Sequence, residues 1–127
     1  MRWIIGIACL LSFVPSAQAV PLPPVMPPVI HEPCPNPPGQ FAGASCTGEG
    51  LPIWLHPDSD PRVYWHELAH HFDYQVMTDY WRNRFRVLVD DANRPWRSPP
   101  NSPHEKFAQA YMLCEIRGPV IRQRPEG

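Results

Sequence analysis

The sequence predicts a mainly α, α+β domain: one short edge strand and three helices behind an extended proline-rich arm. The chain has 127 residues, 43% of them hydrophobic, which suits one compact domain. Prolines crowd the segment 21–38, whereas the later segments carry helix-capping residues and apolar side chains at helical spacing. Together these observations favour an arm of residues 20–39 and a folded domain of residues 40–127.

Residues 1–19 have the three parts of a secretory signal peptide. Arg2 gives a positive start, residues 3–14 are largely apolar, and Ala17 and Ala19 are the small residues that signal peptidase requires. The apolar run is shorter than the about 20 residues of a membrane-spanning helix. We therefore expect cleavage near residue 19, no stable membrane insertion afterwards, and a secreted or otherwise extracytoplasmic protein, such as a periplasmic one.

The cysteines that follow the expected cleavage site are Cys34, Cys46 and Cys114. Disulfides persist in an oxidising compartment, so one pair can form and one thiol is left over. Cys34 with Cys46 would close a short loop, and a bond from either of them to Cys114 would tie the arm to the last helix. The sequence leaves these pairings open. The CxxC spacing of zinc ribbons is absent.

The arm is expected to be extended, not helical and not part of a sheet. Proline fixes φ and lacks the backbone N–H that helices and sheets use, so a polyproline-like conformation is favoured. Glycines at 43, 48 and 50 then predict a loop. Residues 51–55 predict a short strand, in which Pro52 favours an edge position.

Three helices are predicted after this strand. Asp60 as N-cap and Pro61 at the first helical position predict a helix that runs to about Met77. Thr78 or Asp79 caps a second helix. This helix runs to about residue 92, with an apolar stripe of Trp81, Phe85 and Leu88.

A proline-containing loop separates the second helix from the third. The third helix is predicted to open at Ser102 and to end at Gly118 and Pro119. The expected order is therefore arm, strand, helix, helix, loop and helix.

The first helix carries the strongest chemical signal, a run of His66, Glu67, Leu68, Ala69 and His70. Positions four apart share a helix face, so both imidazoles can bind one zinc ion. Glu67 is rotated by about 100° and can act as general base toward water on the metal. The competing interpretation is a surface helix with paired histidines.

A zinc site with an open position needs a third protein ligand, and the candidate is Glu105. His104 is the competing ligand. Ser102 and Glu105 also fit a capping box, in which the glutamate folds back onto the N-cap amide and needs no metal.

Two further residues lie close to the two histidines along the first helix. Asp73 lies on the ligand-bearing face, where it can hydrogen-bond a ligand histidine as a second-shell residue and fix its tautomer. His71 is rotated by about 100° from His70 and is not expected to bind the metal.

Two segments together resemble the Glu-zincin pattern HExxHxxD…ExFAEA[FY]: residues 66–73 and residues 105–111. Metallopeptidases of this family include the catalytic domain of anthrax lethal factor and small bacterial proteins. The resemblance covers about residues 51–115. It implies a minimal zincin-like domain with one Zn²⁺ per chain, held by His66, His70 and Glu105. Gln109 departs from the pattern, and Ser98 stands where a tyrosine often precedes the ligand.

The function implied is a secreted zinc-dependent metallopeptidase that hydrolyses peptide bonds in a peptide or protein substrate through a zinc-activated water. One alternative is a catalytically weak or inactive zincin-derived binding module, and another is a disulfide-stapled binding domain without metal. Without Arg2, ten basic residues (11 minus one) face 12 acidic ones, so nucleic acid is not an expected partner.

Overall fold

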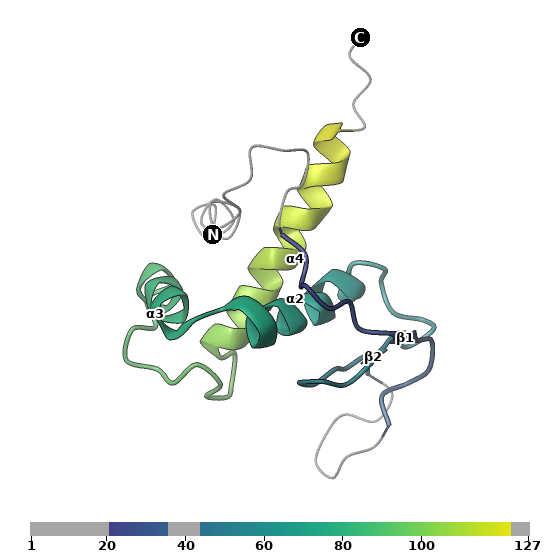
Figure 1. The fold of residues 1–127 in the computed structure, drawn as a ribbon, viewed down its shortest axis with the longest axis horizontal. Helices are drawn as coiled ribbons and strands as arrows, with labels where there is room; N and C mark the ends of the chain where they lie inside the picture. The colour runs from purple at the N-terminus through teal and green to yellow at the C-terminus, as the bar shows by residue number, and fades with distance from the viewer. Residues whose placement is uncertain (1–20, 36–43, 123–127) are drawn as a thin grey trace.

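The structure is a computed structural model, and it describes residues 21–35 and 44–122 (Figure 1). The described elements are β1 (Val29–Ile30), β2 (Ile53–Trp54), α2 (Val63–Val76), α3 (Asp79–Leu88) and α4 (Pro103–Arg122). Three helices with a small two-stranded sheet confirm the mainly helical α+β class. The predicted signal peptide lies outside the described residues. Among the helices that are described, none has the length and apolarity needed to cross a membrane.

The sheet joins the arm to the predicted strand. β1 and β2 run parallel, with Val29 opposite Ile53 and Ile30 opposite Trp54. The strand predicted at residues 51–55 is confirmed, but the expectation that the arm joins no sheet is wrong. The amides of Ile53 and Leu55 donate to the carbonyls of Pro28 and Ile30. Proline keeps its carbonyl, so a proline-rich segment can accept these bonds although it donates few.

The rest of the described arm lies along the helices. The Gln75 side chain of α2 donates to the carbonyl of Val25 and accepts from its amide, both at 2.9 Å. The hydroxyl of Tyr111, on α4, donates to the carbonyl of Pro21 over 2.8 Å. Residues 21–35 are therefore fastened to both α2 and α4, as the purple trace across these helices in Figure 1 shows.

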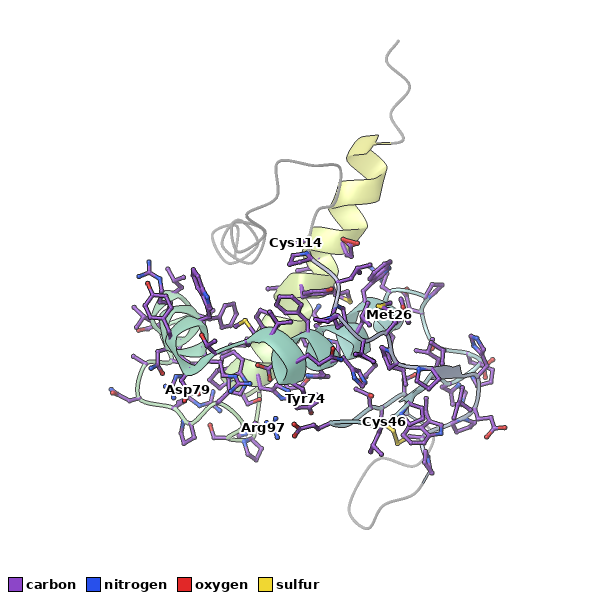
Figure 2. The ribbon with its side chains drawn as sticks, viewed as in Figure 1. Met26, Cys46, Tyr74, Asp79, Arg97 and Cys114 are labelled. Carbon is purple, nitrogen blue, oxygen red and sulfur yellow. A yellow bond between two sulfur atoms is a disulfide. The ribbon has the colours of Figure 1, made fainter. Side chains whose placement is uncertain are left out.

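One disulfide closes the segment that leads back from the arm to the sheet. Cys34 and Cys46 are bonded, with their Cα atoms 5.5 Å apart, so the local pairing is the one that forms. Cys46 exchanges two backbone hydrogen bonds with Trp54, which brings it beside the arm. The expected leftover thiol is wrong, because the described residues contain no free cysteine. Cys114 lies on α4 (Figure 2) and is buried in the core.

The first two helices start differently, and a side chain caps only the second. α2 begins at Val63, slightly later than predicted, because residues 61 and 62 form a turn. The prediction of Asp60 as N-cap is wrong: Arg62 holds that position without a side-chain cap bond, and Asp60 Oδ1 accepts the Arg62 amide at 2.9 Å in the turn before the helix. Thr78 is the N-cap of α3, and its hydroxyl accepts the amide of Trp81.

Both later helix ends differ from the prediction. α3 stops at Leu88 and not near residue 92, because Asp90 adopts a left-handed φ of 60° that breaks the helical repeat. Leu88 is consequently exposed, and Val89 packs on the core in its place. α4 does not end at Gly118 but continues to Arg122.

The core lies where α2 crosses α4. Ala69 and Ala108 are fully buried, and their small side chains let the two helix backbones approach closely. The rings of Phe72, Phe107 and Tyr111 fill the space beside them, with centroids 5.7–6.3 Å apart. Burial of each such ring stabilises the fold by roughly 1.5–3 kcal/mol. The crossing fixes α4 against the helix that carries His66 and His70.

Candidate metal centre

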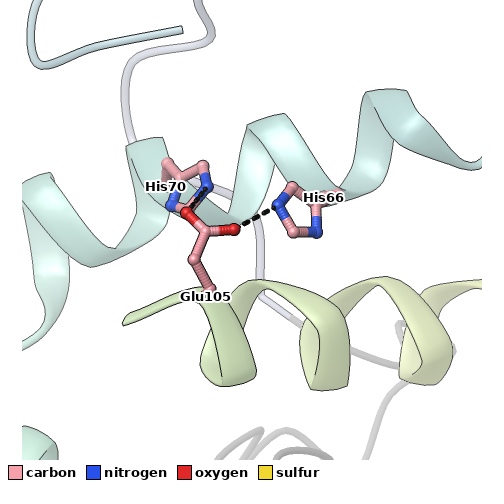
Figure 3. Close-up of side chains that lie close together, drawn as sticks. All are labelled: His66, His70 and Glu105. Carbon is pink, nitrogen blue, oxygen red and sulfur yellow. Dashed lines mark hydrogen bonds and ion pairs between the residues drawn. The ribbon is translucent and has the colours of Figure 1, made fainter. Parts of the chain in front are cut away.

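Two histidines of α2 and one glutamate of α4 converge at the helix crossing (Figure 3). His66 Nε2 lies 3.0 Å from Glu105 Oε2, and His70 Nε2 lies 3.3 Å from Glu105 Oε1. One ligand atom from each residue can be chosen so that all three lie within 4.8 Å of one another. His66, His70 and Glu105 therefore form a group that can hold a metal ion.

The sequence spacing explains this convergence. His66 and His70 stand four positions apart, so they lie one turn above each other on one face of α2, with ring centroids 5.0 Å apart. Glu105 lies in the first turn of α4, close to the point where Ala108 packs against α2. The helix crossing thus brings the third ligand to the histidine face from a distant part of the chain.

Only half of the predicted capping box forms. The hydroxyl of Ser102 accepts the amide of Glu105 at 3.2 Å, as an N-cap does. The carboxylate of Glu105 does not complete the box, because it reaches His66 and His70. Its side chain keeps 46% of its surface exposed, so the group is open on one side.

The contact between Glu105 and the histidines changes the pKa of Glu105 and that of His66 in opposite directions. Hydrogen bonds from His66 and His70 hold the pKa of Glu105 well below its usual range. Burial lowers the pKa of His66, but the hydrogen bond and charge of Glu105 and the charge of Glu67 outweigh it, so the pKa lies above its usual value. At neutral pH, Glu105 is therefore the anion that a metal ligand must be.

His104 lies beside His70 and is not one of the three residues whose ligand atoms converge. Its Nε2 is 2.8 Å from His70 Nδ1, and its Nδ1 is 3.8 Å from Glu105 Oε1. Burial and the neighbouring His70 lower the pKa of His104 to about 4, so at neutral pH its uncharged ring can accept a hydrogen bond from His70 Nδ1. His104 is thus placed to fix the tautomer in which His70 Nε2 is free to bind a metal.

Asp73 contacts the neighbours of the candidate ligands and not, as predicted, a ligand histidine itself. Its fully buried carboxylate accepts from Arg82 Nε at 2.8 Å and from Trp96 Nε1 at 3.0 Å. His104 Nε2 lies 3.6 Å from the same carboxylate. The direct bond expected between Asp73 and a ligand histidine is made by His104 instead, and Asp73 supports the residues around it.

Glu67 is buried at the edge of the group, with 8% of its surface exposed. Burial is the main cause that raises its pKa above the usual value for a glutamate. Glu67 and His66 line two cavities, of about 620 Å³ and about 440 Å³. The larger cavity also contains His70, Glu105 and residues 44–47. The predicted general base and the candidate ligands therefore line the same cavity.

Two residues that the sequence did not assign to the site also contact it. Tyr74 lines the larger cavity, and the Arg97 guanidinium lies 4.8 Å above its ring. Its signal in the sequence was a spacing of four from His70, which continues the ligand face of α2. Gln109, noted only as a departure from the family pattern, hydrogen-bonds His66.

Comparison with known proteins adds no relative. The chain matches no protein-family model, no curated protein and no solved structure. Its function must therefore rest on the geometry of the site.

Proposed function

We propose that this chain is a secreted zinc-dependent peptide hydrolase of the Glu-zincin type. The observation that carries the proposal is the convergence of His66, His70 and Glu105 beside the buried carboxylate of Glu67. A site that only held a metal for stability would gain nothing from a general base at that position. The open side of Glu105 and the adjoining cavity leave space for a substrate.

The donor set favours zinc among the common metals. Two imidazole nitrogens and one carboxylate are the ligands of catalytic zinc sites that keep a fourth position open. Calcium and magnesium prefer all-oxygen sites, which this group does not offer. When bound, zinc would supply Lewis acidity toward a substrate carbonyl and lower the pKa of water to about 7.

The chain's own residues have separate tasks in this mechanism. Glu67 accepts a proton from the attacking water while the water oxygen bonds to the carbonyl carbon of the peptide. Glu67 then returns that proton to the leaving amine as the C–N bond breaks. Its raised pKa suits the first transfer, because a more basic carboxylate takes a proton more readily. His104 holds His70 in the required tautomer.

A backbone edge beside the site favours an extended peptide as substrate. We call residues 44–47 the edge segment, and its residues line the larger cavity together with the candidate ligands. Cys46 uses its own N–H and C=O on Trp54, so the backbone groups of Ser45 and Thr47 turn to the opposite edge. An extended peptide can pair with such an edge and recognise main chain, whatever its side chains.

Export is part of the same proposal. The order of charge, apolar run and small residues in residues 1–19 supports a signal peptide. The Cys34–Cys46 bond fits an oxidising compartment.

A binding module derived from a zincin is the second candidate. Gln109 favours it, since this residue replaces the second glutamate of the family pattern and supplies only a hydrogen bond to His66. Such a module would hold zinc and a peptide without cleaving the peptide, so catalysis by Glu67 separates the two functions.

The decisive test replaces Glu67 with glutamine, which keeps its size but cannot act as a base. We expect Glu67→Gln to slow cleavage of a responsive peptide from a diverse library by about 10²–10⁴-fold, with its zinc retained. Glu32→Gln is the matched control, because this exposed carboxylate lies outside both cavities. Zinc-loaded wild type that cleaves nothing in the library would favour the module. Cleavage that survives Glu67→Gln would refute the mechanism.

A further inference from the structure

His71 follows the ligand His70 in α2 but turns away from the candidate metal ligands. Only 3% of its surface is exposed. Its Nε2 lies 2.6 Å from the hydroxyl oxygen of Thr47, in the edge segment. A buried histidine beside the metal group therefore contacts the opposite wall of the same cavity.

The direction of this hydrogen bond follows from the other bond of Thr47. The Thr47 hydroxyl donates its single proton to the carbonyl of Pro52 over 2.9 Å. The hydroxyl must consequently accept from His71, whose proton then lies on Nε2. Thr47 thus joins the edge segment to the residue before β2 and to the metal-bearing helix at once.

The other bonds of the edge segment lead to the sheet, the arm and the loop after β2. Cys46 is bonded to Cys34 and pairs with Trp54. The Ser45 hydroxyl accepts the amide of His56 at 2.9 Å. These contacts hold the segment to the sheet, whereas the bond from His71 links it directly to the helix that carries His66 and His70.

We propose that His71 is a positioning residue that holds the edge segment at a fixed distance from the metal ligands and thereby sets the affinity for an extended peptide. This inference rests on the proposed function and deepens it, since it names His71 as the residue that supports the edge segment where the peptide would bind. A net hydrogen bond contributes about 0.5–1.5 kcal/mol, so its loss should weaken peptide binding by about three- to tenfold.

The test uses zinc-loaded full-length mature protein with Glu67→Gln, whose slowed cleavage leaves time to measure how tightly the peptide binds. The probe is a peptide that wild type cleaves, and its Kd is measured by calorimetry. We expect His71→Leu and Thr47→Val each to raise the Kd by about three- to tenfold, and the double variant to raise it no further than the stronger single one.

Conservative variants separate positioning from bulk stability. His71→Gln places an amide N–H near the position of Nε2 and should restore the Kd, whereas His71→Asn places it near Nδ1 and should not. Thr78→Val is the matched control: it removes the other threonine hydroxyl with a backbone partner, the cap of α3, and should leave the Kd unchanged. When Glu67 is left intact, His71→Leu and Thr47→Val should raise the KM for the peptide and leave kcat nearly constant.

A second readout needs no peptide. In His71→Leu the backbone amides of Cys46 and Trp54, which hold the edge segment to β2, should exchange with solvent faster, while amides within α2 keep their protection. Unchanged exchange at both amides would show that the bond from His71 to Thr47 does not hold the edge segment and would overturn the proposal. A Kd unchanged in His71→Leu and Thr47→Val would overturn it while the proposed function stands. A parent protein that holds zinc but binds no library peptide would instead refute the proposed function, and this inference with it.

Discussion

Glu105 serves the fold and the candidate metal site through different atoms. Its amide completes the cap at Ser102, and its carboxylate meets His66 and His70. Glu105→Gln keeps the amide but removes the anionic ligand. We expect it to weaken zinc binding well beyond tenfold in a competition titration, because a neutral amide is a poor zinc ligand, and to change the free energy of unfolding without zinc only slightly.

Ser102→Ala is the complementary variant. It removes the cap and leaves the carboxylate in place, so it should cost about 1 kcal/mol of stability and keep the zinc affinity. If Glu105→Gln bound zinc as tightly as wild type, Glu105 would be a capping residue alone.

Sequence spacing was sufficient to place the two candidate histidine ligands together and insufficient for the residues around them. The four-residue interval predicted that His66 and His70 share a face, and the helical repeat predicted that His71 does not. The roles of His104 and Thr47 could not be predicted, because each depends on a rotamer and a proton position set by contacts across long stretches of sequence.

At the scale of elements, a buried ion pair connects α2 to α3. Arg82 of α3 binds both the carboxylate and the backbone carbonyl of Asp73 on α2. Trp96, in the loop before α4, donates to the same carboxylate. Asp73 is fully buried, so loss of Arg82 would leave a desolvated carboxylate without a cation, held by the Trp96 N–H.

Arg82→Met should therefore lower the free energy of unfolding by about 3 kcal/mol, the lower end for breaking a buried pair, since Arg82 is itself partly exposed. Chemical denaturation measures this. Arg84→Met is the matched control, because exposed Arg84 stacks on Tyr80 and should cost less than about 1 kcal/mol. Equal effects of the two substitutions would show that the pair does not stabilise the fold.

Element boundaries were predictable where a side chain caps the helix and less so elsewhere. Thr78 is a cap whose chemistry is visible in the sequence, whereas Asp60 bonds the turn before α2 and is not its N-cap. The end of α3 depends on the left-handed backbone at Asp90. Glycine is the usual sequence signal for that conformation, and the residue here is an aspartate. The strand in the arm forms because the carbonyls of Pro28 and Ile30 accept hydrogen bonds. The prediction considered only the N–H groups that prolines lack.

At the scale of the whole molecule, the disulfide and the arm complete the cavity wall. The Cys34–Cys46 bond spans a sequence separation of 12, and a loop of about this size contributes roughly 3 kcal/mol in the chain-entropy model. The double variant Cys34→Ser, Cys46→Ser should lose about 2–3 kcal/mol of stability in denaturant titrations. Its zinc affinity should be nearly unchanged, since the ligands lie on α2 and α4.

Peptide cleavage should fall in the same double variant, because the edge segment that contains Cys46 loses one of its attachments. Full cleavage activity together with a lowered stability would mean that this wall does not contribute to substrate binding.

The overall class was predictable because helix caps, apolar spacing and the proline-rich arm are local signals. The packing of the arm on α2 and α4 was not, since it depends on Gln75 and Tyr111 finding backbone partners far away in the sequence. The family pattern indicated Glu105 as third ligand, but the sequence does not show the crossing at Ala69 and Ala108 that brings it to α2.

Zinc stoichiometry tests the central claim most directly. Mature protein titrated with zinc, and analysed for metal after desalting, should hold about one zinc per chain. His66→Ala and His70→Ala should each abolish that binding, and His31→Ala, which alters an exposed histidine of the arm, should leave it intact. A wild-type chain that retains no zinc after exposure to ample metal, or that loses none when His66 and His70 are both replaced, would contradict the assigned metal centre.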